Sequence, residues 1–384
     1  MRLPTLKKGF EPLICEGDAF ARGQTQGEAL QRQIHLCLNA FYQSPLYARL
    51  RSKRMPRRWS DYFLHQRARK HIIKSLQEQS EHYQFLQGLA RGSGIPLNKL
   101  LLFCAVESLL SGLKHGPTPG LGQCSMVLVP GNFSSTGEPL LMKNVDYPYF
   151  LKSFNLWRSS KPTEGIENLS LTLSPQSGCH TGMNTSGLAI TYNTTHGPDT
   201  SPGRLPASMH IQEALRLCHT AEEAVTWLQK QTYEGGCIVG IMDREQIFLM
   251  EIYGTEIQVK PIENRVLMAS NHYQLMPEHN PPASHCYTDP ALPELKDTRT
   301  LASSEARLDR INELAGTKIH FHPQDLLEFF QDHGSSREAT DNTLCRHGRF
   351  YETTASVLLM PNQREARFTL NAPCEANYVS YQWY

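Results

Sequence analysis

Apolar side chains in the first third of the chain recur at the spacing of buried helix faces. The pattern predicts one helix from Ala19 to Leu38 and another through Ile72 to Leu89 that ends near Gly92. Asn98 is placed to cap a further helix, Lys99 to Leu110, whose apolar residues cover nearly every side. We therefore expect a helical region with this last helix buried inside it.

The pattern changes to short β-type runs after Gly112 to Gly122, a stretch rich in glycine and proline. Cys124 to Val129 and Pro139 to Val145 flank a turn-prone segment and predict a hairpin. Later strands are predicted at Leu169–Leu173, Leu188–Tyr192, Cys237–Met242, Ile247–Ile252, Val266–Ala269, Thr354–Met360 and Glu365–Leu370. Later helices are predicted at Ala207–Cys218, Ala221–Gln231, Ser304–Leu314 and Pro323–Asp332. Strands and helices grouped in this way indicate a layered α+β fold with largely antiparallel sheets.

Composition limits the class of protein without naming a function. With 384 residues, 40% of them hydrophobic, and a formal net charge of +1, the sequence predicts a soluble globular protein of one large or two smaller domains. The balanced charge gives no general attraction to nucleic acid. Apolar stretches such as Leu100 to Val106 are too short to cross a bilayer, and Met1 to Lys8 lacks the apolar core of a signal peptide. A cytoplasmic location with no membrane partner is therefore expected.

The ten cysteines are scattered along the chain and form no Cys-x-x-Cys pair. In a chain of this size, that distribution argues against a disulfide scaffold and against a structural zinc site. His196, His272 and His347 can be combined with Cys345 as metal ligands, but their separation favours structural histidines. The sequence therefore predicts no metal.

Cys124 opens an apolar strand directly behind the glycine- and proline-rich stretch. A cysteine in such a place is most often a small core residue. If the chain were cut before it, however, the residue would carry a thiol and a free α-amine together. The thiol has an ordinary pKa of about 8.5 and needs a base, and an α-amine with a pKa of about 8 can take its proton. No histidine is then required.

Polar residues at the ends of neighbouring strands can assist such a nucleophile. Asp146 closes the second strand of the hairpin, where its carboxylate can orient the new amine. Asn193 and Asn271 each end a later strand, and amide N–H groups at strand ends suit an oxyanion hole. The alternative is that Asp146 caps a turn and that both amides satisfy backbone groups.

Several short motifs follow one another in a definite order. They are Cys124-Ser125, Asn144-x-Asp146, Asn184-x-x-Gly187-Leu188 with Asn193, Asn271-His272 and Leu344-Cys345-Arg346-His347, with Arg22-Gly23-Gln24 near the start and Ala372-Pro373-Cys374-Glu375 near the end. In these motifs the chain resembles the acyl-CoA:isopenicillin N acyltransferase family of N-terminal-nucleophile hydrolases and, more distantly, the choloylglycine hydrolases. The resemblance implies a four-layer αββα sandwich.

The resemblance also implies an inactive precursor that cuts itself between Gln123 and Cys124. The products would be a helical α chain, residues 1–123, and a catalytic β chain, residues 124–384. Cys124 would be the nucleophile with its own amine as base, Asp146 would hold that amine, and Asn193 and Asn271 would form the oxyanion hole.

The implied reaction is attack on a linear amide or an acyl thioester, through a thioester acyl-enzyme, with release to water or to an amine. No cofactor is implied other than coenzyme A, as the thioester of an acyl donor. Arg346 falls where the family has an arginine near the nucleophile, with Arg349 as a close alternative in sequence. Gln123 replaces the glycine that precedes the nucleophile in the best-known member. Lys143 replaces an arginine of the choloylglycine hydrolases, which loses bidentate recognition and disfavours bile salts as substrates.

Two other functions fit the same sequence. One is a hydrolase of the unprocessed chain, in which His272 or His347 serves Cys124 as the base. The other is a non-catalytic binding module that uses the basic segment at Arg49 to Arg58, where six cations precede Trp59. Such a segment is most often a solvated surface, and it could otherwise attract coenzyme A phosphates, a nucleic acid or an anionic membrane.

Overall fold

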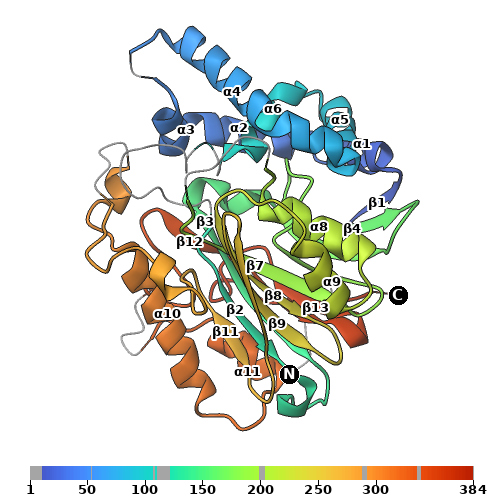
Figure 1. Cartoon of the computed structure of the whole chain (residues 1–384), viewed down its shortest axis with the longest axis vertical. Helices are drawn as coiled ribbons and strands as arrows, with labels where there is room; N and C mark the ends of the chain where they lie inside the picture. Colours follow the sequence, from blue (N-terminus) through green and yellow to red (C-terminus); the bar gives the residue numbers. More distant parts are fainter. Residues whose placement is uncertain are drawn as a thin grey trace.

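The computed structural model describes residues 11–52, 54–106, 109, 122–198, 204–287, 292–334 and 339–383. The predicted loop from Gly112 to Gly122 and the end of the predicted helix Lys99 to Leu110 fall largely outside these residues. Two β-sheets lie face to face at the centre of the molecule. Helices cover their outer faces, and a further group of helices lies at one end (Figure 1).

The larger sheet has eight strands in the described part of the chain. Their order is β1 (Leu13–Gly17), β4 (Asn155–Pro162), β5 (Asn168–Leu173), β6 (Thr181–Asn184), β7 (Ala189–Thr195), β8 (Gly236–Met242), β9 (Ile247–Tyr253) and β10 (Glu256–Pro261). Neighbouring strands are antiparallel except β1 and β4, which are parallel. The predicted helical region 1–123 therefore also supplies a strand. Its separation from 124–384 as a distinct chain remains a prediction.

The smaller sheet has six described strands and carries the predicted hairpin. Their order is β11 (Leu267–Ala269), β2 (Ser125–Val129), β3 (Leu140–Pro148), β12 (Tyr351–Met360), β13 (Glu365–Thr369) and β14 (Val379–Gln382). β2 and β3 pair antiparallel with Ser125 opposite Asn144, which confirms the hairpin. Asp146 lies opposite Thr353 on β12, and the register shifts between Thr353 and Ala355. Such irregularities re-aim side chains beside functional sites.

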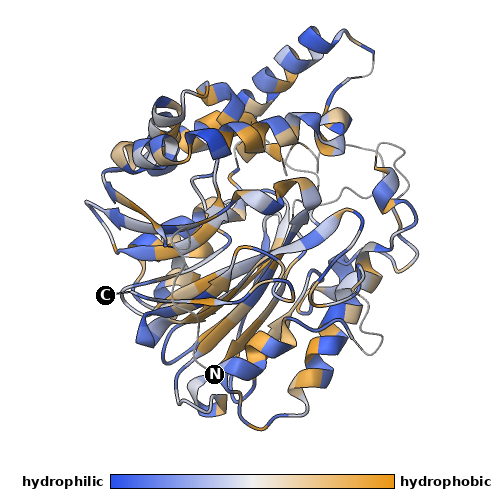
Figure 2. Ribbon diagram, turned by 180° about the vertical axis from the view of Figure 1, so that it is seen from behind, coloured by the Kyte–Doolittle hydropathy of each residue, from blue (hydrophilic) through white to orange (hydrophobic). Residues whose placement is uncertain are grey.

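Helices cover the outer face of each sheet. α8 (Ala207–Leu217) and α9 (Ala221–Leu228) pack on the larger sheet, and α10 (Thr300–Ala315) and α11 (Pro323–Phe329) pack on the smaller one. Apolar side chains between the sheets form the main core, which continues into the N-terminal helices. Figure 2 shows these apolar residues gathered along the central strands. The predicted α+β fold with αββα layers is confirmed.

The N-terminal helices begin and end at other residues than the sequence predicts. They are α1 (Ala19–Ala29), α2 (Gln31–Gln43), α3 (Pro45–Leu50), α4 (Arg57–Glu78), α5 (Ser80–Ser93) and α6 (Leu97–Cys104). The predicted helix Ala19 to Leu38 breaks at Leu30, because α1 packs a glycine face on α5 whereas α2 buries a separate apolar face. The pattern Ile72 to Leu89 likewise spans two helices, which meet at Gln79. No helix among the described residues is long and apolar enough to cross a membrane.

The start of α6 corrects the predicted cap. Pro96, with φ of −56°, supplies the N-cap, and the helix begins at Leu97 rather than after Asn98. Proline suits this place because its fixed φ favours a helix start and its missing N–H would have had no helical acceptor.

Glycines bring α1 and α5 into close contact. Gly23 and Gly27 of α1 face Gly88 and Gly92 of α5, all spaced by four residues. A Cβ at Gly23 or Gly88 would lie 2.0 or 1.9 Å from a carbonyl oxygen of the other helix. These positions therefore require glycine for reasons of space.

Candidate active site

Cys124 directly precedes β2 and is buried between the two sheets. The alternation along β2 places Met126 and Leu128 in the core between the sheets, and Cys124 belongs to the same cluster. Ser125 and Val127 face the opposite way, toward α10 and α11. The thiol and the flanking peptide groups therefore meet different surroundings.

Lys143 is the charged side chain with the largest effect on the Cys124 thiol. Burial raises the pKa of Cys124, while the Lys143 ammonium, a backbone hydrogen bond from Asp146 and the Arg307 charge lower it. Lys143 is itself buried, with Nζ 3.2 Å from Asn193 Oδ1 and in contact with the Tyr192 carbonyl oxygen. Burial lowers the pKa of Lys143, and the charges of Cys124 and Asp146 oppose that shift.

Arg307 reaches the backbone of Cys124 from α10. Its Nη1 donates to the Cys124 carbonyl oxygen at 2.8 Å and to Ser125 Oγ at 2.9 Å, and its Nη2 donates to Asn271 Oδ1 at 2.8 Å. The side chain is fully buried. Arg307 is not among the residues that the sequence predicts for the site, although it lies four residues before the buried Ile311 on the same helix. The signal in the sequence was that Arg307 is a cation on the apolar face of the helix that became α10.

The Asp146 carboxylate is buried with only one of its oxygens hydrogen-bonded. Oδ1 accepts a hydrogen bond from Thr353 Oγ1 at 2.7 Å, and Oδ2 lies 4.0 Å from Arg307 Nη1. No described residue gives Oδ2 a hydrogen bond. Burial raises the pKa of Asp146, and the charges of Arg307 and Arg346 oppose that shift. A carboxylate in this position can accept further donors.

The two predicted oxyanion residues both lie beside Cys124. Asn193 Nδ2 is 3.4 Å from the Cys124 carbonyl oxygen and 2.7 Å from that of Ser270. Asn271 is connected to the site through Arg307, and its Nδ2 donates to the Thr194 carbonyl oxygen at 2.6 Å. In the uncut chain both amides therefore donate to backbone carbonyl groups.

Arg346 contacts the residue before the nucleophile. Its Nη1 donates to Gln123 Oε1 at 2.7 Å, and its Nη2 lies 2.9 Å from Asp341 Oδ1. Gln123 also donates its N–H to the Asp146 carbonyl oxygen at 2.9 Å. Arg349 is exposed, so of the two candidate arginines it is Arg346 that lies at the site. Its contacts are with Gln123, whereas Arg307 contacts Cys124.

The sequence match decides the family. Residues 134–375 match the family described as acyl-coenzyme A:6-aminopenicillanic acid acyl-transferase. The chain belongs to this family. The match confirms the resemblance stated above and makes the protein an enzyme of amide and acyl-transfer chemistry. It includes Asp146, Asn193, Asn271 and Arg346 but begins after Cys124, so it does not itself test the nucleophile.

Some solved structures show partial likeness to the chain. An N-acylethanolamine-hydrolyzing acid amidase ortholog from Caenorhabditis elegans is 14% identical over 62% of this chain and 93% of its own, with a TM-score of 0.42. Penicillin V acylase from Agrobacterium tumefaciens is 13% identical over 64% and 83%, with a TM-score of 0.42. A conjugated bile acid hydrolase variant from Clostridium perfringens is 11% identical over 68% and 97%, also at 0.42. No curated protein sequence matches. Because these scores are low, the family assignment rests on the sequence match.

Neither histidine of the alternative hydrolase contacts the Cys124 thiol within the described residues. His272 Nδ1 lies 2.8 Å from Ser304 Oγ, and His347 Nε2 lies 3.1 Å from Cys374 Sγ. A third histidine, His180, packs against the Tyr147 and Tyr192 hydroxyl groups. Burial lowers the pKa of His180 to about 3. A neutral imidazole held in this way is a structural group. Among the described contacts, Asn193 and Arg307 reach the Cys124 carbonyl oxygen, and the Lys143 charge acts on the thiol.

A small polar cavity lies beside this group of residues. It is lined by Cys104, Tyr147, Gln176, Gly178, His180, Tyr192, Pro206, Ser208 and Met209. Lys143 Nζ lies 3.5 Å from the carbonyl oxygen of His180, which links the cavity to the family site.

The basic segment Arg49 to Arg58 lies apart from the strands, across the end of α3 and the start of α4 (Figure 1). Arg57 and Arg58 are exposed, and Trp59 beyond them is 60% exposed. The binding function suggested for this segment stays a prediction.

Proposed function

We propose that the chain cuts itself between Gln123 and Cys124 and that Cys124 then acts as the nucleophile of an amide hydrolase or acyltransferase. The observation that carries the proposal is Asp146 Oδ2, which is buried beside the start of β2 and receives no hydrogen bond from the described residues. Buried carboxylate oxygens are nearly always hydrogen-bonded. An α-ammonium group formed at Cys124 by cleavage would supply donors for this oxygen.

The peptide before Cys124 is held on both sides of Gln123, which supports a fixed scissile bond. The Thr194 hydroxyl donates to the Gly122 carbonyl oxygen, and the Gln123 N–H donates to Asp146. Arg346 binds the Gln123 side chain, a contact that glycine at this position would lack. Gln123, which replaces the family's glycine, thus has a specific partner in Arg346.

Self-cleavage needs a base other than the amine that it creates. We assign this role to Lys143, because burial lowers its pKa toward the neutral form that can accept a proton, and because the Lys143 and Cys124 side chains influence each other's pKa. Lys143 takes the thiol proton, and the sulfur attacks the carbonyl carbon of Gln123. The C–N bond breaks, and the Cys124 nitrogen leaves as an amine after taking the proton back from Lys143. Water then hydrolyses the thioester, which leaves a carboxylate on Gln123 and restores the thiol.

In turnover, the α-amine of Cys124 takes the thiol proton and Asp146 holds the resulting ammonium. The sulfur attacks the carbonyl carbon of a linear amide or an acyl thioester, and the leaving amine or thiol takes that proton. Asn193 and Asn271 stabilise the oxyanion. The acyl-enzyme then passes its acyl group to water or to an amine acceptor. The family name supports an acyl coenzyme A thioester as one donor.

Intact mass and N-terminal sequencing of the purified protein test the first half of the proposal. We expect the wild-type chain, and a Cys286→Ser control, to yield a fragment that begins at Cys124. Cys124→Ala should stay at 43.5 kDa. A wild-type chain that stays intact as long as Cys124→Ala would contradict self-cleavage.

Amine release from a panel of acyl amides, and acyl transfer from acyl coenzyme A to amines, test the second half. Cys124→Ser should slow turnover of any confirmed substrate by several orders of magnitude, since the alkoxide is harder to form. Turnover at the wild-type rate in this variant would rule out Cys124 as the nucleophile, whether or not the chain is cut.

A further inference from the structure

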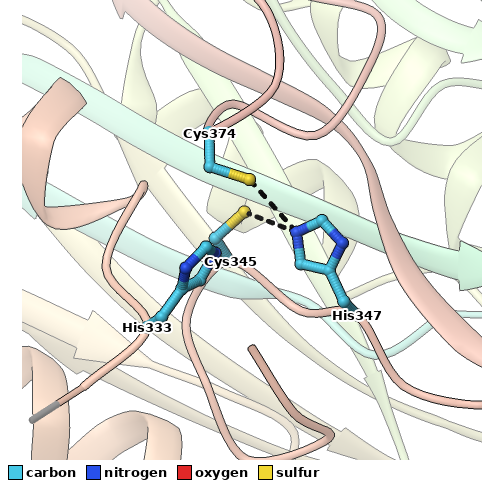
Figure 3. A group of neighbouring side chains, drawn as sticks. All are labelled: His333, Cys345, His347 and Cys374. Atoms are coloured by element: carbon cyan, nitrogen blue, oxygen red, sulfur yellow. Dashed lines mark hydrogen bonds between the residues drawn. The ribbon is translucent and has the colours of Figure 1, made fainter. Parts of the chain in front are cut away.

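Two cysteines and two histidines meet beside Arg346, away from the Cys124 thiol. They are His333, just after α11, Cys345 and His347 on either side of Arg346, and Cys374 near the end of the chain (Figure 3). One ligand atom from each lies within 4.8 Å of all the others. The sequence analysis considered Cys345 and His347 as ligands but combined them with histidines that lie elsewhere.

The distances fit tetrahedral coordination of zinc. With Zn–S bonds of about 2.3 Å and Zn–N bonds of about 2.05 Å, a tetrahedral site has sulfur and nitrogen ligands about 3.6 Å apart. His347 Nε2 lies 3.5 Å from Cys345 Sγ and 3.1 Å from Cys374 Sγ. Figure 3 shows this nitrogen aimed at both sulfur atoms. Small movements would therefore bring the group around one ion.

Two further observations indicate that this is a built site. His333 Nε2 is buried and has no hydrogen-bond partner among the described residues. The second nitrogen of His347, Nδ1, lies 3.7 Å from Glu375 Oε1, and zinc-bound histidines commonly turn their free nitrogen to a carboxylate. The Cys345 N–H donates to the Asp332 carbonyl oxygen at 3.1 Å, which fastens the His333 segment to the Cys345 segment.

We propose that His333, Cys345, His347 and Cys374 bind one zinc ion. Binding would release the two thiol protons, and two thiolates would balance the charge of Zn²⁺. Four protein ligands leave no open position for substrate, so the ion has a structural role. It ties three segments of the chain together around Arg346, whose guanidinium holds Gln123. The proposal does not depend on self-cleavage or on the role of Cys124.

Metal analysis and cobalt spectroscopy test this site directly. After dialysis against a chelator and reconstitution with zinc, we expect about one zinc ion per chain. Cobalt in its place should show thiolate charge-transfer bands and the visible absorption of a tetrahedral ion. Cys374→Ser changes an exposed residue and should lose the thiolate bands and most of the zinc. Cys286→Ser, a cysteine outside the cluster, should keep both.

Three results would overturn the proposal. One is wild-type protein with no zinc after reconstitution. Another is equal zinc content in Cys374→Ser and Cys286→Ser, which would indicate metal bound elsewhere. The third is a disulfide between Cys345 and Cys374 in protein purified without reductant, seen by peptide mass in place of zinc. If Cys374→Ser fails to fold, the cobalt spectrum of the wild-type chain still decides between sulfur ligation and its absence.

Discussion

Arg307 lies outside the sequence-predicted site but contacts it at several atoms. Its buried guanidinium donates to the Cys124 carbonyl oxygen, Ser125 Oγ and Asn271 Oδ1, all at 2.8 to 2.9 Å. Arg307→Met would keep the apolar stem while removing the charge and the donors. Asp146 would then lose the cation that most favours its ionised form. Because removing one partner of a buried charged pair leaves the other uncompensated, we expect a loss of about 3 to 5 kcal/mol in the free energy of unfolding.

Arg310, one turn later on α10, provides the matched control. It pairs with Asp332 and Glu313 but is 24% exposed, so solvent screens both pairs. Arg310→Met should therefore cost only about 1 kcal/mol. Arg307→Lys should fall between the two Met variants, because an ammonium keeps the charge but lacks the planar fork that spans three acceptors.

Urea unfolding followed by tryptophan fluorescence measures these differences. All variants would carry Cys124→Ala, so that cleavage cannot alter the chain. With a slope of about 3 kcal/mol per molar urea, Arg307→Met should lower the midpoint by about 1 to 1.7 M and Arg310→Met by about 0.3 M. Equal urea midpoints for Arg307→Met and Arg310→Met would refute the inference that the buried Arg307 guanidinium stabilises the site.

Three further predictions concern the helix contact, pH and the base. Gly88→Ala should cost about 1 to 3 kcal/mol, because its Cβ would lie 1.9 Å from the Phe20 carbonyl oxygen of α1. Gly316→Ala should cost less in the same urea assay, because its Cβ would lie no closer than 3.2 Å to any heavy atom outside its chain neighbours. His180 has its pKa lowered to about 3, so between pH 6.5 and 3 the unfolded chain binds the proton that the folded chain excludes. The free energy of unfolding should thus fall on acidification by up to about 1.4 kcal/mol per pH unit, and His180→Asn should make this pH dependence less steep. An unchanged pH dependence in His180→Asn would contradict the assignment to His180. Lys143→Met should block self-cleavage. When another protease cuts before Cys124, turnover by this variant should stay within about tenfold of the wild-type rate. Equal self-cleavage rates in Lys143→Met and the wild type would exclude Lys143 as the base.

The hairpin and the position of Asp146 were predictable because both depend on local sequence. Continuous apolar runs mark β2 and the start of β3, and a hairpin brings the start of one strand beside the end of the other. Edge strands such as β10, Glu256–Pro261, were missed because their exposed side chains give no apolar run. Arg307 was missed because its position depends on how α10 packs across the sheet, which no local pattern encodes. The ligand cluster was missed for a related reason, since His333 and Cys374 approach Cys345 only in the folded chain.

The two sides of β2 explain how one residue can take part in both proposed reactions. The Cys124 thiol faces the space between the sheets, where Lys143 supplies the available amine. The Cys124 peptide group faces α10, where Arg307 already holds its carbonyl oxygen. Asp146 lies on that same side, and its Oδ2 receives no hydrogen bond from the described residues. On the proposed pathway, cleavage changes the Cys124 nitrogen from an amide to an ammonium, while Arg307 keeps its hydrogen bond to the Cys124 carbonyl oxygen. The new terminus is therefore held by side chains that the uncut chain has already positioned, so activation requires no refolding of the core.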